Sequence, residues 1–195
     1  MKRLLVAVVS MVLLVLGASS APAAAQPPGD SVTGSGTTGN FFGRFQIDVR
    51  SGPSGENPTG QASFESGVIG PIDGPATCLA VSGKVAVFNL QTPQFGVVTF
   101  EITDNAGSGQ PDTIEGRATG QNEGRSPTDC SPLSNGLSEI VVEGDVVVVD
   151  APPLPTSKEQ CKNGGWRTFG VFKNQGDCVS FAATGGKNPP GKERP

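Results

Sequence analysis

The sequence predicts an all-β domain, an antiparallel sandwich or barrel of about seven or eight strands, followed by a small disulfide-linked α-helical hairpin. Three observations predict this fold. Apolar and polar residues alternate over short segments, which is typical of half-buried strands. Turn-forming residues separate those segments, since the 195 residues include 28 Gly and 17 Pro. No long segment has helical periodicity, which leaves a sandwich and a barrel as equal alternatives.

The first 25 residues have the organisation of a cleavable signal peptide. Two basic residues precede an apolar run from Leu4 to Leu16, and small residues follow up to Ala25. A membrane-spanning helix is the alternative, but it needs about 20 apolar residues. We expect cleavage after Ala25, with Ala21 as the second choice. The prediction is a secreted protein, extracellular or associated with the cell envelope, with no membrane anchor in the mature chain.

Residues 26–40 are rich in Gly, Ser, Thr and Pro and are predicted to be a flexible leader. The β domain is predicted to span residues 41–150. Its clearest strand places Phe45, Ile47 and Val49 on one buried face. Further strands are predicted within residues 61–66, 76–81, 84–90, 95–104 and 112–119.

The last part of the β domain is predicted to be a loop followed by a hairpin. Residues 119–137 are polar and contain Pro, which is typical of a long loop. Residues 139–150 are expected to turn at Glu143-Gly144-Asp145. The continuous run Val146–Val149 that follows indicates a strand covered on both faces.

A Pro-rich linker at residues 151–156 separates the β domain from a module at residues 157–186, and residues 187–195 are predicted to be a disordered tail. The module begins with a helix-start signature. Either Thr156 with Glu159 or Ser157 with Gln160 makes the capping box. Asn174 is expected to cap a second short helix.

The four cysteines of the mature chain are Cys78, Cys130, Cys161 and Cys178. An even number in an exported protein indicates two disulfides, for which three pairings exist. We favour Cys78–Cys130 and Cys161–Cys178, because each bridge then stays within one domain. A zinc site is disfavoured, since no two of these cysteines have C-x-x-C spacing.

Composition excludes several kinds of chemistry. The chain has no His and no Tyr, so nucleophile pairs that use His and zinc sites that use His are impossible. Residues 26–150 hold five Lys or Arg against fifteen Asp or Glu, a net charge of −10, whereas residues 151–195 hold seven against three, a net charge of +4. The acidic domain would repel phosphate, and no nucleic-acid partner is expected.

The segment SKEQCKNGGWRTFGVFKNQGDCVSF, residues 157–181, resembles a short C-terminal module that recurs at the ends of many exported bacterial proteins. The matching positions include Lys158, Cys161, Trp166, Asn174 and Cys178. The preceding domain more loosely resembles uncharacterised secreted bacterial β domains, through residues 81–86, 102–105 and 111–113. The resemblance implies export and a β fold, and it implies no activity.

Two groups of residues are candidates for binding. Asp104, Asn105 and Asp112 offer oxygen ligands for calcium, although such sites need six to eight oxygens, and a solvated turn is the alternative. Calcium is the one cofactor that the sequence suggests.

The second group is a basic aromatic patch of Trp166, Lys162, Arg167 and Lys173, which suits an anionic cell-wall polymer or another surface protein. The alternatives are that Trp166 forms the module core, or that the module docks on the acidic domain.

The resulting hypothesis is a secreted, non-catalytic binding or structural protein, whose C-terminal module mediates contact with the envelope or with a protein. The alternative is an extracellular hydrolase that uses carboxylates. Glu139, Glu143 and Asp145 are its candidate residues. The two hypotheses differ in geometry, because an enzyme needs carboxylates that converge in one pocket.

Overall fold

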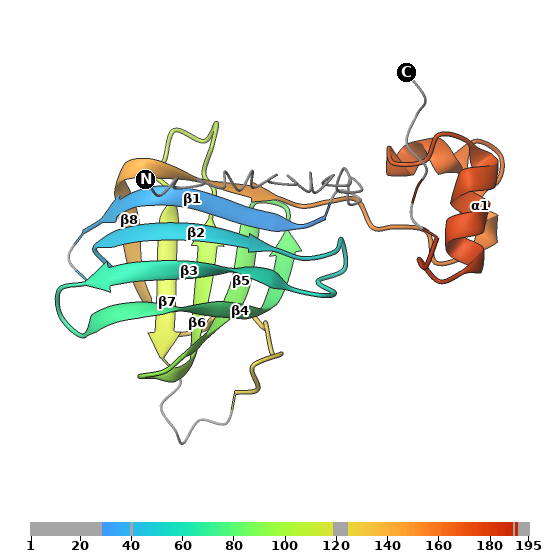
Figure 1. Cartoon of the computed structure of the whole chain (residues 1–195). Helices are drawn as coiled ribbons and strands as arrows, with labels where there is room; N and C mark the ends of the chain where they lie inside the picture. The colour runs from blue at the N-terminus through green and yellow to red at the C-terminus, as the bar shows by residue number, and fades with distance from the viewer. Residues whose placement is uncertain (1–28, 40, 119–124, 189, 191–195) are drawn as a thin grey trace, which may run out of the picture.

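The computed structural model describes residues 29–39, 41–118, 125–188 and 190 (Figure 1). The predicted signal peptide, the first residues of the predicted leader and most of the predicted tail lie outside the described residues.

Eight antiparallel strands form a closed barrel, which decides between the two predicted architectures. Each strand pairs with the next along the chain, and β8 pairs with β1 to close the barrel (Figure 1). The strands are β1 (Ser31–Thr38), β2 (Arg44–Arg50), β3 (Thr59–Ser66), β4 (Gly70–Ser82), β5 (Val85–Thr92), β6 (Gly96–Thr103), β7 (Thr113–Ala118) and β8 (Leu137–Val149).

Alternating side chains fill the interior of the barrel, as the sequence pattern of β2 and β6 predicts. Phe64 and Phe100 stack with their ring centroids 4.0 Å apart, and Phe42, Phe45 and Phe88 pack around them. All five rings are buried. Small barrels are commonly filled by side chains in this way.

The prediction of a flexible leader is wrong for β1, which is paired along its length with both β2 and β8. Its Gly and Ser content has a structural cause. Gly36 faces Gly144 of β8, and a Cβ on Gly36 would lie 2.0 Å from the Glu143 carbonyl oxygen. Glycine permits this close approach of two backbones. The β domain therefore begins at Ser31 rather than at residue 41.

The predicted last hairpin is also wrong, because β8 is one continuous strand through Gly144. Gly144 has a φ of +94° beside a register shift opposite Thr37 and Thr38, so it bends the strand instead of reversing it. Nor is the valine run covered on both faces. Val146 and Val148 are buried, whereas Val147 and Val149 are exposed.

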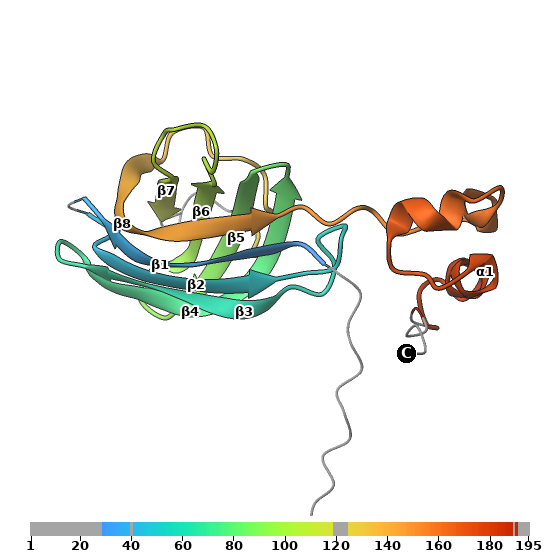
Figure 2. The same cartoon turned by 90° about the horizontal axis from the view of Figure 1, so that it is seen from above.

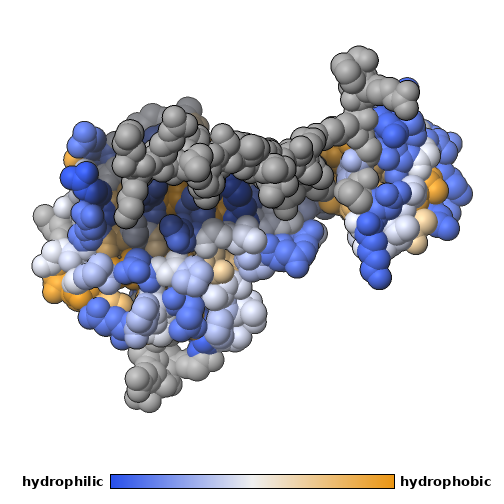
Figure 3. Space-filling model, viewed as in Figure 1, coloured by the Kyte–Doolittle hydropathy of each residue, from blue (hydrophilic) through white to orange (hydrophobic). Residues whose placement is uncertain are grey.

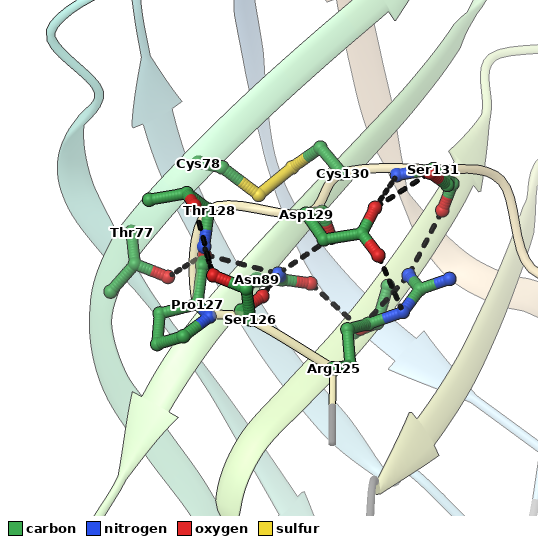
Figure 4. The surroundings of a disulfide bond; sticks show 11 residues. Thr77, Cys78, Asn89, Arg125, Ser126, Pro127, Thr128, Asp129, Cys130 and Ser131 are labelled. Atoms are coloured by element: carbon green, nitrogen blue, oxygen red, sulfur yellow. Dashed lines mark hydrogen bonds and ion pairs between the residues drawn. A yellow bond between two sulfur atoms is a disulfide. The ribbon is translucent and has the colours of Figure 1, made fainter. Parts of the chain in front are cut away.

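Both favoured disulfides are present, Cys78–Cys130 and Cys161–Cys178. The first holds residues 125–136, which we call the strap, against the outer face of the barrel (Figure 4). The strap contains no strand or helix, in agreement with the predicted loop. Asn89 is fully buried beneath it and donates hydrogen bonds to the carbonyls of Ser126, Pro127 and Asp129.

The C-terminal module consists of two short 3-10 helices, η1 (Lys158–Cys161) and η2 (Gly165–Phe169), and one α-helix, α1 (Gln175–Ala183). The predicted hairpin is thus only partly α-helical. Ser157 and Gln160 form the capping box of η1, and the Asn174 side chain caps α1 by accepting from Asp177 N at 2.9 Å. Cys161, Phe172, Cys178 and Phe181 form a core separate from that of the barrel.

Candidate functional site

The basic aromatic patch of the module is centred on two neighbouring residues in η2. The Arg167 guanidinium carbon lies 4.9 Å from the centroid of the Trp166 ring, a cation–π arrangement. Trp166 is half-buried against the module core, and Arg167 is exposed. Trp166 therefore packs against the module core and is also partly exposed at the surface, so its roles as a core residue and as a patch residue are compatible.

The other two predicted patch residues are exposed but differ in their surroundings. Lys162 forms an ion pair with Glu159 at 2.5 Å. Lys173 precedes α1, and its backbone N–H donates to the Asp177 carboxylate at 3.3 Å. Across residues 157–188, five Lys or Arg stand against two Asp or Glu, a net charge of +3. These cations are spread along the module sequence from Lys158 to Lys187, and hydrophilic residues cover much of the module face visible in Figure 3, beside smaller apolar patches.

The linker that joins the module to the barrel is shorter than its sequence indicates. Ala151 is buried, and its N–H donates to Asp30 Oδ1 at 2.9 Å, so it belongs to the barrel. Leu154 packs against the module core. Pro152 and Pro153 alone stand exposed between these two anchors. Because proline fixes φ and favours an extended conformation, this pair acts as a stiff spacer, and the module projects beyond the end of β8 (Figures 1 and 2).

The three residues predicted to bind calcium lie together at the β6–β7 loop, but the carboxylates of Asp104 and Asp112 already accept hydrogen bonds within the barrel. Asp104 Oδ2 accepts from Lys84 Nζ at 2.8 Å and from Val148 N at 3.0 Å. Asp112 accepts from Asn105 N at 2.8 Å and from Val146 N at 3.1 Å. Each of these bonds uses an acceptor that a calcium ion would need.

The surroundings of Asp104 also favour the structural role. Burial by itself raises the pKa of this carboxyl, but the bonds from Lys84, Val148 and Ala106 outweigh it and lower the pKa. Among the described residues, no three His, Cys, Asp or Glu side chains are placed to hold a metal ion. Calcium binding by Asp104, Asn105 and Asp112 remains a prediction.

The three carboxylates of the hydrolase alternative lie in different surroundings. Glu139 accepts hydrogen bonds from Thr38 Oγ1 and from the N–H groups of Phe41 and Phe42, and so fixes the β1–β2 connection. Glu143 lines a hollow of about 550 Å³ on the outside of β1, β2 and β3. Asp145 lines a different hollow of about 310 Å³ beside the β6–β7 loop.

Asp145 has an unusual electrostatic environment. A hydrogen bond with the Asp112 carboxyl is the main cause that raises the pKa of Asp145, and the negative charges of Asp112 and Asp104 add to it. A carboxyl with a raised pKa is a feature of general acids. In this protein the raised pKa of Asp145 follows from its position next to the Asp112 carboxylate, which already accepts the N–H of Val146 in β8.

The sequence reasoning missed the polar cluster beneath the strap. Asn89 and Thr99 are fully buried on the outer face of β5 and β6, and Thr99 Oγ1 donates to Asn89 Oδ1 at 2.7 Å. Arg125 donates to the Ser131 carbonyl at 2.9 Å and so ties the start of the strap to its middle (Figure 4). An Asn in the middle of an apolar strand was the available signal.

These features define a class of protein: a filled, closed β-barrel that presents a small basic disulfide-bonded module at its C-terminal end. Comparisons with models of protein families, with curated proteins and with solved structures find no match to this chain. No helix among the described residues has the length and hydrophobicity to cross a bilayer. The function must therefore be inferred from the site itself.

Proposed function

We propose that the chain is exported and acts as a non-catalytic binding protein, whose C-terminal module contacts an anionic surface of the cell envelope. The observation that carries this proposal is the Trp166–Arg167 pair, a cation stacked on an aromatic ring in a module with a net positive charge. Arg and Trp are enriched among residues that dominate binding energy. The two disulfides support the extracellular setting, because disulfides persist in oxidising compartments.

In this proposal the barrel holds the module in place and does not itself bind the anionic polymer. Its described residues hold five Lys or Arg against fourteen Asp or Glu, a net charge of −9. An anionic polymer is repelled by the barrel and attracted by the module. The stiff Pro152-Pro153 spacer keeps the positive surface away from the negative one, so that the module remains accessible to a partner.

The test is binding of the mature chain to poly(glycerol phosphate), a model for anionic wall polymers, with neutral dextran as the reference. We expect co-sedimentation with the anionic polymer that weakens as salt is raised. The variant Arg167→Glu/Lys173→Glu should bind about tenfold more weakly, because each exposed ion pair contributes up to about 1 kcal/mol. Unchanged binding by this variant would contradict the proposal.

The matched control reverses charge on the barrel instead. Arg44 and Arg50 are exposed, and Arg44→Glu/Arg50→Glu makes the same change in net charge. This control should bind the polymer nearly as well as the unchanged chain. An equal loss in both variants would mean that net charge alone governs binding, and that the module has no special part in it.

The raised pKa of Asp145 is the observation that favours the hydrolase as a second candidate. Its neighbours argue for a structural role, because Glu143 and Asp145 line separate hollows and Glu139 is engaged by three donors. Release of reducing sugar from wall polysaccharide by the unchanged chain, abolished in Asp145→Asn, would establish the hydrolase.

A further inference from the structure

The outer face of β8 leaves an apolar surface without a partner in the described chain. Val142 is 66% exposed, Ile140 52%, Val149 45% and Val147 44%. The neighbouring β1 presents only small side chains there, since Thr33 lies opposite Val147 and Ser31 opposite Val149. We call Ile140, Val142, Val147 and Val149 the β8 face. Several large apolar side chains exposed along one strand are a common mark of an interaction surface.

Negative charges divide and border the β8 face. Glu143 and Asp145 are exposed between its two apolar pairs, and Asp150 follows Val149. Two copies of this face would therefore repel each other if they packed together symmetrically. The face instead suits a partner that offers apolar surface together with positive charge.

The C-terminal module of the same protein has that chemistry. Arg167 lies over the half-buried Trp166 ring, and Phe169 and Val171 are also only partly buried. Lys162 and Lys173 add exposed positive charge. The module therefore combines apolar side chains with cations, whereas the β8 face combines apolar side chains with carboxylates.

The spacer keeps these two complementary surfaces apart within one molecule. Ala151 is fixed to the barrel by Asp30, and Leu154 is fixed to the module core. Two prolines in an extended conformation span only about 6 Å and provide no turn. The module continues away from the end of β8 (Figures 1 and 2), so folding it back onto the β8 face would require one of these anchors to break.

We propose that copies of this protein associate head to tail, with the module of one copy seated on the β8 face of another. Such a contact joins two different surfaces, so it produces either a closed ring or an open chain. Because the β8 face offers only four large apolar side chains, we expect a weak contact with micromolar or weaker affinity. The inference uses the same module as the proposed function but does not depend on polymer binding.

The experiment is sedimentation equilibrium of the mature chain from about 10 μM to about 1 mM, the range in which weak interfaces are populated. One variant, Val147→Lys/Val149→Lys, disrupts the β8 face. A second variant, Arg167→Glu/Lys173→Glu, disrupts the module. The matched control, Thr59→Lys/Gln61→Lys, adds the same charge at exposed positions of β3.

The unchanged chain and the β3 control should both increase in average molar mass with concentration, whereas each disrupted variant alone should remain monomeric. A mixture of the two disrupted variants should form one-to-one complexes and nothing larger, because it contains one intact β8 face and one intact module for each pair. This complementation is the decisive result, because variants that had lost their fold could not form the complex.

Three results would overturn the proposal: a monomeric unchanged chain at the highest concentration, association that survives Val147→Lys/Val149→Lys, or association lost equally in the β3 control. Polymer binding separates this inference from the proposed function. The β8-face variant should still co-sediment with poly(glycerol phosphate), so that either proposal can fail while the other stands.

Discussion

The Asp104 carboxylate accepts the backbone N–H of Val148 at 3.0 Å, although 44 residues separate them in the chain. Asp112 accepts from Val146 and Asp30 from Ala151 in the same way. Three buried aspartates thus accept N–H groups of β8 and of Ala151, which follows shortly after it. Asp104 and Asp112 hold the part of β8 that lacks a paired strand on the β7 side, because β7 pairs with β8 only up to Ile140. Asp30 extends the contact between β1 and β8 by one further residue.

Replacing Asp104 should weaken the barrel in a pH-dependent way. Asp104→Ala leaves the buried Val148 N–H without its acceptor, which costs about 1–3 kcal/mol of the free energy of unfolding. Because the pKa of Asp104 is lowered in the folded state, its charge stabilises the fold above the unfolded pKa of about 3.9. That stability is lost as the pH falls through the folded pKa.

Urea unfolding at pH 7 and at pH 3 measures this effect. The difference between Asp104→Asn and the unchanged chain should be larger at pH 7 than at pH 3. The exposed Asp73 of β4 supplies the control, because Asp73→Asn should change the free energy of unfolding by less than about 0.5 kcal/mol. A pH-independent effect at Asp104 would contradict the electrostatic explanation.

Replacing Asp145 should have the opposite effect on stability at pH 7, a gain instead of a loss. Its pKa is raised in the folded state, so its protonated form favours folding and that stability is lost as the pH rises through the folded pKa. Asp145→Asn removes the repulsion from Asp112 and should raise the midpoint of thermal unfolding at pH 7. This gain in the unfolding midpoint should be smaller at pH 3, where Asp145 is largely protonated in either state. Scanning calorimetry at pH 7 and pH 3 measures both midpoints, and an equal gain at the two pH values would contradict the explanation.

Gly144 should tolerate no side chain. A Cβ there would lie 2.1 Å from the Ser35 carbonyl oxygen, and the φ of +94° is unfavourable for other residues. Gly144→Ala should destabilise the barrel by about 2–4 kcal/mol through strain and the forced separation of β1 from β8. Gly67→Ala is the control, since a Cβ at Gly67 meets nothing within 4 Å. Comparable unfolding midpoints for the two variants would refute the close packing of β1 on β8.

The two disulfides should affect different parts of the molecule. On the chain-entropy relation, Cys78–Cys130 closes a separation of 52 residues and contributes about 4 kcal/mol, whereas Cys161–Cys178 closes 17 and contributes about 3 kcal/mol. Cys161→Ser/Cys178→Ser should unfold the module and leave the barrel folded, because the module core contains only four buried residues. Limited proteolysis should then trim the chain to a stable fragment ending near residue 155. If the module of the variant resisted the protease as well as the module of the unchanged chain, the disulfide would not be needed for its fold.

Much of the fold followed from local patterns. Phe45, Ile47 and Val49 are buried as their alternation predicts, and the capping residues Ser157 and Asn174 mark the starts of η1 and α1. Both disulfide pairings were also favoured from the sequence, because each joins cysteines within one domain. The patch pair Trp166 and Arg167 was visible because its members are adjacent in the chain.

Other features depended on contacts between distant segments. The sequence of β1 has the composition of a flexible segment, because its stability comes from backbone pairing with β2 and β8 rather than from apolar side chains. Gly144 suggested a turn because glycine permits both a reversal and a close backbone approach. The role of Asp104 was hidden because its partner, Val148, is brought near only by barrel closure.

The sequence by itself determined the all-β class, the separate basic module, the cysteine pairing that we favoured and the absence of histidine chemistry, because these properties follow from composition and local periodicity. The tertiary structure alone decided that the sheet closes through β1 and β8, that the carboxylates of Asp104 and Asp112 accept backbone N–H groups of β8, and that one face of β8 remains uncovered. The physical reason is that barrel closure pairs backbones more than a hundred residues apart, and such pairing leaves no periodic signal in the side chains of either strand.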